Sequence, residues 1–470
     1  MEKVQSINLS KAVVDAKRLV EDRQLSEHVR ATLRTLIEGV TVMTHQLGIG
    51  SHNSSMPPSR GGFGVKKTRE SAKGEKRKPG AQAGHKGSTL KKFEDPDEIQ
   101  ELQIDRRTVP KGFYKTVGHE VRQVVELELL RRVVQYEAEI IECSDGQQYV
   151  AEFPSGVTQA VQYGESTKAV AVYLSQHQLI PLERVASFFE DQAGVAVSKG
   201  SVSRFIEEAS DLLVDYEKWA IEQLTLSSLA HADETGINIG GAGYWLHSLS
   251  NLHVTLFHPD KQRGHDAMER MGVLPHFQGI LCHDHWQPYF GYLCRHALCN
   301  AHHLRELEWV IEFEKHDWAS AMQKLLVEIN TQKLTDRELT EKQQEQYRKR
   351  YREILKAGEL ESPVEPKPEG KRGRVKKTKA RNLLERLQNF EVETLLFMTC
   401  KDIPFTNNQA ERDIRMTKVQ QKISGCFRTL QGAKNFCRIR GYLSTCQKNG
   451  INAVLALKLL FQKKLPAFMV

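Results

Sequence analysis

The chain has 470 residues, of which 40% are hydrophobic and 27% charged, and its formal net charge is +8. This length is sufficient for two to four domains, each with a core of its own. No apolar run approaches the roughly 18 residues of a membrane span, and charges interrupt the N-terminal stretch where a signal peptide would be apolar. A cytoplasmic protein is therefore expected, and its eight scattered cysteines are expected to remain free thiols.

The first segment, 1–50, is predicted to be a helix from about Asn8 to Leu47. Apolar residues recur along it at the spacing of a coiled-coil seam. Self-association through this seam and packing of the helix on its own chain are equally compatible with the pattern. The seam consists of Val29, Leu33, Leu36, Val40, Met43 and Leu47.

The next segment, 51–93, is rich in Gly, Ser, Pro and Lys and almost lacks apolar residues. Between Arg60 and Lys92 it carries eleven Lys or Arg against two Glu, an excess larger than the net charge of the chain. Such a composition predicts disorder. Its charge favours a polyanionic partner, nucleic acid first, over a merely solubilising linker.

Two modules of different character are expected next. Residues 94–155 alternate in a strand-like way and predict a small β-rich module. Residues 156–227 have helical periods, with one helix, a turn at Gly194 and a second helix capped by Ser198. This region resembles a helix-turn-helix, although an ordinary helical hairpin fits the spacing as well. The candidate DNA contacts near the start of its second helix are Ser201, Ser203 and Arg204.

From residue 228 the pattern changes to three strands, a helix and a fourth strand. This order opens an RNase H-like α/β domain, so we expect a multidomain α/β protein with an RNase H-like catalytic domain over 228–450. A charged helical stretch predicts a helical insertion at about 303–400, and a C-terminal helix is expected over 451–470.

Two aspartates are expected at the ends of apolar strands, Asp233 in LAHADETG and Asp284 in GILCHDHW. Carboxylates are the ligands that Mg²⁺ prefers, and a pair of such ions activates the attacking oxygen and stabilises the leaving one in phosphoryl transfer. By strand alternation, His283 and His285 are expected to point away from the face that carries Asp284.

The third acid is expected to be Glu411, in the first turn of a helix with Asn408 as its N-cap. A capping box, in which Glu411 only closes the helix start, is the competing interpretation. Against it, Glu411 shares a helix face with Arg415, Lys418 and Lys422, which suits a metal ligand beside a track of DNA phosphates.

Histidines and cysteines near Asp284 raise the question of zinc. No paired Cys-x-x-Cys occurs among them, and the lone Cys-x-x-His of Cys299 and His302 is a weak zinc signal. The sequence therefore favours a bracing role for these two residues and disfavours zinc.

The motifs together resemble the transposases of the insertion sequence 66 family. The resemblance implies a catalytic triad at Asp233, Asp284 and Glu411, and it places Cys299 and His302 on a Cys-x-x-His pair after the second acid. A small zinc module found in relatives is reduced here to Cys143. The matching segments are SHNSSMPPSR, GAQAGHKGSTL, YGESTKAVAVYLSQHQLIPLERV, VSKGSVSRF, HADETG, YWLHSLSN, GILCHDHWQPYF, CNAHHLREL, TNNQAERDIRMTKVQQKISGCFRT and NGINAVLAL.

The sequence thus predicts a DNA transposase that cuts the ends of an insertion sequence and joins them to target DNA, using two Mg²⁺ or Mn²⁺ ions. Arg415, Lys418, Lys422 and Arg428 would hold phosphates. Double-stranded DNA is the expected partner, a homo-oligomer the expected state, and accessory proteins of the same element are conceivable partners. The alternative is a non-catalytic DNA-binding protein derived from a transposase; a plain RNase H-type nuclease fits the basic flanks less well.

Overall fold

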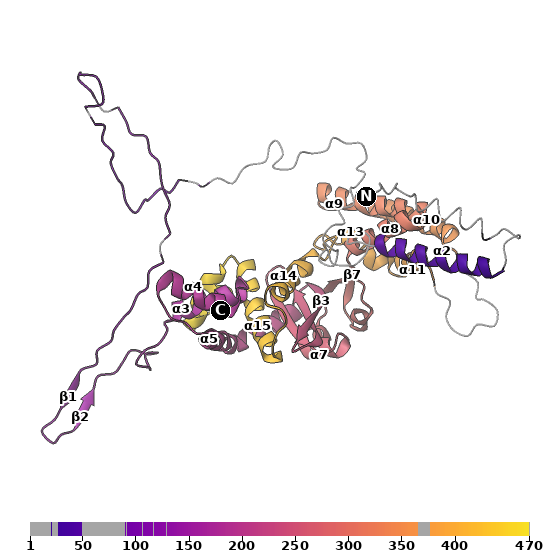
Figure 1. The fold of residues 1–470 in the computed structure, drawn as a ribbon. Helices are drawn as coiled ribbons and strands as arrows, with labels where there is room; N and C mark the ends of the chain where they lie inside the picture. Colours follow the sequence, from indigo (N-terminus) through magenta and orange to yellow (C-terminus); the bar gives the residue numbers. More distant parts are fainter. Residues whose placement is uncertain are drawn as a thin grey trace.

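The structure is a computed structural model. It describes residue 20 and residues 27–48, 90, 92–105, 107–115, 117–127, 129–364 and 377–469. Within them lie a five-stranded sheet with its covering helices, a helical insertion and an extended N-terminal arm (Figure 1). No helix in these ranges has the length and apolar character needed to cross a membrane.

The sheet has the strand order β5-β4-β3-β6-β7. The first three strands in sequence form an antiparallel meander, and the chain then crosses over through α7 (His265–Met271) and a short 3₁₀ turn, η3 (Leu274–His276), so that β6 lies parallel to β3 and β7 parallel to β6. This confirms the predicted order of three strands, a helix and a fourth strand. The strands are β3 (Leu229–Ile239), β4 (Ala242–Ser250), β5 (Thr255–Asp260), β6 (Ile280–His283) and β7 (Arg295–Leu298).

Strand alternation divides the buried side chains between the two faces of the sheet. In β3, Ala230 and Ala232 belong to one hydrophobic cluster, whereas Ile237 and Ile239 belong to another that includes Ile414 of α14 (Asn408–Ser424). Asp233 is separated from Ile237 and Ile239 by an even number of residues, so its side chain lies on the same face of β3 as theirs. Asp233 therefore points to the face on which α14 packs.

The helices predicted over 156–227 are present. The α4 helix (Leu182–Ala193) ends at Gly194, whose φ of 58° is left-handed, and α5 (Lys199–Leu212) starts at Ser198, whose side chain accepts a hydrogen bond from the Ser201 amide. This confirms both the turn and the cap. The other helices here are α3 (Glu165–Val172), the π-helix η2 (Tyr173–His177) and α6 (Val214–Thr225).

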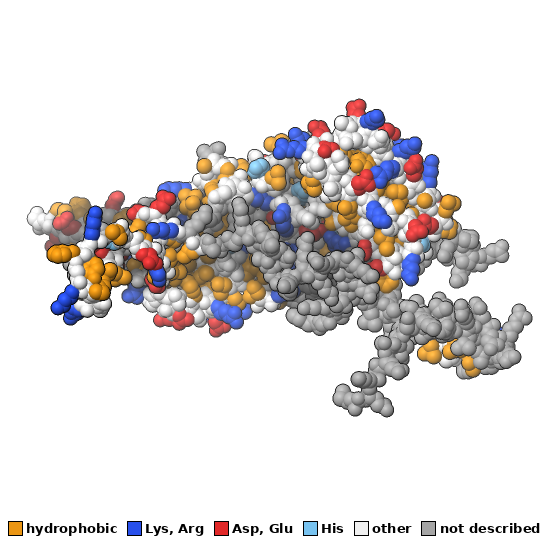
Figure 2. Space-filling model, turned by 90° about the horizontal axis from the view of Figure 1, so that it is seen from above, with side chains coloured by type: hydrophobic (Ala, Val, Ile, Leu, Met, Phe, Trp, Pro, Cys, Tyr) orange, Lys and Arg blue, Asp and Glu red, His pale blue; other side chains and the backbone are white. Residues whose placement is uncertain are grey.

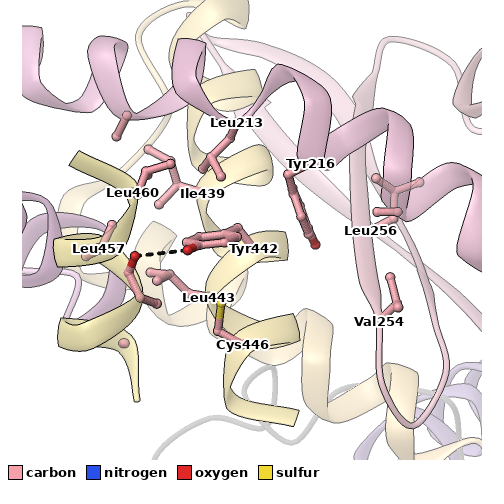
Figure 3. Packing of buried hydrophobic residues seen from close by; sticks show 14 of the residues in the cluster. Leu213, Tyr216, Val254, Leu256, Ile439, Tyr442, Leu443, Cys446, Leu457 and Leu460 are labelled. Carbon is pink, nitrogen blue, oxygen red and sulfur yellow. Dashed lines mark hydrogen bonds between the residues drawn. The ribbon is translucent and has the colours of Figure 1, made fainter. Parts of the chain in front are cut away.

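These helices share one core with the C-terminal helices and the sheet. Leu213 and Tyr216 pack with Leu256 of β5 and with α15 (Leu430–Lys448) and α16 (Ala453–Phe461), as Figure 3 shows. The Tyr442 hydroxyl donates to the Ala456 carbonyl at 3.0 Å across the two last helices. One hydrophobic cluster thus spans the boundaries expected at 227/228 and 450/451.

The helical insertion between β7 and α14 has its own core, which also covers Cys282 of β6 and Ala297 of β7. The insertion therefore packs at the β6–β7 end of the sheet. Its basic Pro/Gly-rich loop falls on 365–376, outside the described residues. The helices are α8 (Asn300–Phe313), α9 (Asp317–Asp336), α10 (Glu341–Glu361), α11 (Lys379–Asn389), α12 (Glu391–Thr394) and α13 (Leu396–Thr399), and the short 3₁₀ turns η4 (Gln287–Gly291) and η5 (Ala467–Met469) lie elsewhere in the chain.

The N-terminal helix α2 spans Glu27–Gly48. Two of its predicted seam residues, Val29 and Leu36, are 43% and 60% exposed, which leaves the predicted self-association as a prediction. The side chains of Val40, Met43 and Leu47, the helix predicted before residue 20, and nearly all of the 51–93 segment lie outside the described residues.

The predicted β-rich module is mostly not a sheet. In the described part of 92–161 the strands are β1 (Ile140–Glu142) and β2 (Gln148–Val150), an antiparallel hairpin, and most of the remaining chain runs irregularly with exposed side chains. The alternation of residues 121–139 was therefore misleading, because period-2 patterning makes a strand only where a neighbouring strand accepts its hydrogen bonds.

On the face that Figure 2 displays, acidic and basic side chains are interspersed.

The start of β6 depends on a close approach of two backbones. A Cβ at Gly279 would lie 2.8 Å from the Ser228 carbonyl oxygen and closer still to that of Ser227. We expect Gly279→Ala to destabilise the fold by about 1–3 kcal/mol, because backbone oxygens cannot rotate away. Urea unfolding measures this, with Gly243→Ala as the control, since that position has no atom within 4 Å. Equal midpoints for the two variants would contradict the prediction.

Candidate active site

Asp233 and Asp284 occupy equivalent positions on neighbouring parallel strands. His231 of β3 is paired with Cys282 of β6, and each aspartate follows its paired residue by two positions. Both carboxylates therefore leave the sheet on the same face. The expectation that Asp233 ends its strand was wrong, since β3 runs on to Ile239 through its pairing with β4. The parallel pairing of β3 with β6, by contrast, ends at His231, two residues before Asp233.

The electrostatics show that acidic groups crowd this point. Burial raises the pKa of the Asp233 carboxyl well above its usual range, and the negative charges of Glu234, Asp284 and Glu411 raise it further. The Glu234 amide donates to Asp233 Oδ1 at 2.9 Å, which opposes the rise. The negative charges of the acid after β6 and of the acid on α14 thus act on the carboxyl group of β3.

Glu234 is a fourth acid here, which the sequence analysis did not single out. Its side chain is 2% exposed, and it accepts hydrogen bonds from Arg263 Nη2 and the Tyr289 hydroxyl, both at 2.6 Å. The Arg263 guanidinium in turn lies between the rings of Trp245 and Trp286, 4.6 and 4.4 Å from their centres. This clamp holds one carboxylate of the cluster in place. In the sequence, the only sign of this fourth acid is that Glu234 directly follows Asp233. Its partners Arg263 and Tyr289 lie 29 and 55 residues further along the chain.

Glu411 lies in the first turn of α14, as predicted, but the helix start differs from the prediction. The N-cap is Asn407, not Asn408, and it makes no side-chain capping bond. Asn408 is exposed, so neither the predicted cap nor the competing capping box forms. Asn407 instead is 1% exposed and turns its amide toward the sheet.

Both ends of α14 are tied to β3. At the start, Asn407 Nδ2 donates to the Ala232 carbonyl at 2.7 Å, and its Oδ1 lies 2.8 Å from His231 Nδ1. After the end, the Phe427 amide donates to the Asn238 carbonyl at 3.0 Å. These bonds fix the helix that carries Glu411 against the strand that carries Asp233.

A nearly buried ion pair holds the same helix from the other side. Lys448 of α15 donates to Asp413 Oδ2 at 2.8 Å, and the two side chains are 12% and 11% exposed. The ammonium also donates to Thr255 Oγ1 at 2.6 Å, which joins the pair to β5. The α14 helix is thereby braced on two sides.

Glu411 also faces the start of α8. Its Oε1 lies 3.5 Å from Arg305 Nη2 and 4.0 Å from His302 Nδ1. Cys299 is the N-cap of α8, and its sulfur accepts the Asn407 amide at 3.1 Å. The bracing role predicted for the Cys-x-x-His pair thus has a counterpart in the Cys299 contact, while His302 Nδ1 and Glu411 Oε1 are buried without a hydrogen-bond partner.

Within the described ranges, one group of His, Cys, Asp and Glu residues has three ligand atoms within 4.8 Å of one another: Cys299, His302 and Glu411. At least one pair among the carboxylates of Asp233, Asp284 and Glu411 is therefore farther apart than that. Ligands shared between two ions 3.5–4 Å apart, each with bonds of about 2.1 Å, can be up to about 8 Å apart. The three acids can share such a pair only if their ligand oxygens lie within about this distance of one another.

The backbone after Asp284 is unusual. His285 has a φ of 76°, a left-handed conformation that is rare without glycine. Asp284 Oδ1 accepts the Trp286 amide at 3.1 Å, and His285 packs its ring on Phe290, as His283 also does. That both histidines point away from the face that carries Asp284 stays a prediction. A strained turn held by aromatic packing is common at functional sites.

The predicted DNA-contacting residues divide into two groups. Arg415, Lys422, Arg428 and Arg204 are exposed, and Ser203 is partly exposed. Lys418, by contrast, donates its ammonium to the Gly236 carbonyl of β3. Ser201 is only 5% exposed, and its hydroxyl lies 3.0 Å from that of Ser198. A contact of Ser201 with DNA stays a prediction, and its hydroxyl lies beside the Ser198 side chain that caps the helix.

Comparison with known proteins bears on the larger part of the chain. A family model described as the transposase IS66 family matches residues 160–435. A second model, a family of unknown function called DUF6444, matches residues 3–91. No protein of curated function matches the chain. The first match covers the sheet, the helical insertion and α14, and so includes all of the acids described above.

Proposed function

Because the chain belongs to the IS66 family of transposases, we propose that it cuts DNA at the ends of an insertion sequence and transfers the strands to a target, with Asp233, Asp284 and Glu411 as the catalytic acids. The family implies a DNA-binding protein with nuclease-like chemistry. The single observation that carries the finer proposal is that Asp284 and Glu411, which come from two other elements, lie close enough to Asp233 for their negative charges to add to the effect of burial on its pKa.

The strand order supports the same proposal. A meander of three strands followed by two parallel strands, with the first acid on the first strand and the second just after the fourth, is the arrangement expected for an RNase H-like domain. The two faces of the sheet are covered by helices, and the long insertion stands between the second and third acids.

The donor set fits a pair of Mg²⁺ or Mn²⁺ ions. Carboxylate oxygens are the ligands that these ions prefer. Burial, and then the nearby negative charges, raise the pKa of Asp233, and bound divalent cations would offset both effects. Bound ions would activate the attacking oxygen and stabilise the leaving one. Asp233, Asp284 and Glu411 would hold them, and the clamp from Arg263 and Tyr289 would keep Glu234 from competing for them.

Protein groups around the acids would position the DNA. Arg415 and Lys422 lie beyond Glu411 on α14, and Arg428 follows the helix, all of them exposed. We place phosphates along this line, where cationic side chains fix the register of a duplex without reading its sequence. Lys418 would act through β3 rather than on the DNA.

The test is strand cleavage by the full chain on DNA that carries the inverted repeats flanking its gene. We expect nicking that requires added Mg²⁺ or Mn²⁺ and that is lost in Asp284→Asn and in Glu411→Gln, while both variants still shift the DNA in a gel. Binding without metal-dependent nicking by the unmodified chain would contradict the proposal and favour a non-catalytic DNA-binding protein.

A further inference from the structure

We propose that Cys299, His302 and Glu411 form a binding site for a thiophilic divalent cation such as Zn²⁺, and that an ion held there takes Glu411 away from the magnesium site. The second half rests on the proposed nuclease function, whereas the binding itself does not. Sequence spacing alone disfavoured zinc, because two of the ligands come from a lone Cys-x-x-His and the third lies 109 residues further along the chain.

The first argument is the ligand set. A thiol, an imidazole and a carboxylate are the groups that bind Zn²⁺, and three protein ligands leave a fourth position for water. Their ligand atoms already lie within 4.8 Å of one another. Tetrahedral bonds of 2.0–2.3 Å require ligand atoms about 3.3–3.8 Å apart, so side-chain movements of about 1 Å would complete the site.

The second argument is that two of the three atoms make no hydrogen bond, although Glu411 Oε1 also lies 3.5 Å from Arg305 Nη2. His302 Nδ1 and Glu411 Oε1 are 4.0 Å apart, and each is buried without a hydrogen bond. A buried polar atom without a partner destabilises the folded state. A shared cation would satisfy both atoms at once.

The surrounding charges suit a cation. Asp284, Glu411 and Glu306 all act on His302, opposed by Arg305. Burial and Arg305 lower the pKa of His302, so its ring is neutral at pH 7 and has a lone pair to donate. Burial raises the pKa of the Cys299 thiol to about 11, so coordination must release the thiol proton to solvent.

Direct titration of the metal-depleted full chain with Co²⁺ tests the binding. Coordination by sulfur gives a charge-transfer absorption in the near ultraviolet, which we expect in the unmodified chain and not in Cys299→Ser. Binding of Co²⁺ or Zn²⁺ to the metal-free chain should release about one proton for each ion, and Zn²⁺ should displace bound Co²⁺ without further proton release. Cys143→Ser is the matched control, because that cysteine is exposed and stands outside the group.

Two further variants keep the proposal testable if Cys299→Ser does not fold. His302→Gln and Glu411→Gln should each weaken Co²⁺ binding by more than about 10- to 100-fold, the scale for loss of a group that only orients a metal ligand. An unchanged absorption in Cys299→Ser, or unchanged affinity in both of the other variants, would overturn the proposal.

The consequence for catalysis is measured separately. At saturating Mg²⁺, micromolar Zn²⁺ should inhibit strand cleavage by the unmodified chain, and Cys143→Ser should be inhibited equally. Zn²⁺ binding without inhibition would contradict the proposed withdrawal of Glu411 from the magnesium site. It would not contradict the binding of Zn²⁺ itself. A chain that binds Zn²⁺ but never cleaves DNA would contradict the proposed function and not the binding site.

Discussion

Asp233→Asn is expected to lower metal-dependent strand cleavage by roughly 10⁴-fold, the scale on which a principal catalytic group acts, and at the same time to stabilise the metal-free protein at neutral pH. The two effects share one cause. Asp233 stands among Glu234, Asp284 and Glu411 in a partly buried position where its negative charge is unfavourable without bound cations. Asparagine keeps the shape of the side chain and removes both the charge and the metal ligand.

The stability effect has a defined sign in pH. The folded-state pKa of Asp233 is raised above the value of about 4 that an aspartate has in an unfolded chain. Between these two values the folded state binds more protons than the unfolded state, so the free energy of unfolding falls as pH rises. Asparagine does not titrate. The stability difference in favour of the variant should therefore open above about pH 4 and be complete above the raised pKa.

Bound Mg²⁺ should make the unmodified chain more stable than Asp233→Asn. Mg²⁺ at 100 times its dissociation constant stabilises a folded protein by about 2.7 kcal/mol, and we expect this gain for the unmodified chain and not for Asp233→Asn. Urea unfolding at several pH values, with chelator or with Mg²⁺, measures both effects. Asp211→Asn on the exposed surface of α5 is the control. A variant that is less stable than the parent without metal at pH 7 would show that Asp233 is not crowded by the other acids.

Much of this site could be predicted from sequence because the relevant signals are local. Gly194 and Ser198 mark a helix end and a helix start by chemistry that acts within one turn, and the structure has both. Asp233 and Asp284 each follow an apolar run that forms a strand, and parallel pairing of those runs is enough to place the two carboxylates side by side.

What could not be predicted depends on contacts between distant segments. The alternation of residues 121–139 gives no sign of whether a partner strand exists, and none is paired with it among the described residues. Glu234 reads as a neighbour of Asp233, yet its role depends on Arg263, held between two tryptophans. In TNNQAE, either asparagine can cap a helix, and only the position of β3 decides that Asn407 faces the sheet.

Asn407→Ala is therefore expected to have a large effect where Asn408→Ala has almost none. The substitution leaves the Ala232 carbonyl and His231 Nδ1 without their partner, and each unsatisfied buried group costs about 1–3 kcal/mol. It also releases the start of α14 from β3, four residues before Glu411. A displacement of about 1 Å at a catalytic group lowers rates by about 10²-fold, and the Mg²⁺ concentration for half-maximal cleavage should rise because one ligand is misplaced.

Urea unfolding and cleavage at varied Mg²⁺ separate the two effects, since a helix start that served only stability would leave the Mg²⁺ dependence unchanged in the folded protein. Asn408→Ala is a matched control, because Asn408 is exposed and makes no capping bond in α14. If Asn408→Ala were the more harmful of the two, the helix would start one residue later than the structure has it. Glu411 would then lie in the third position of the helix, where closing its first turn would account for it without any metal.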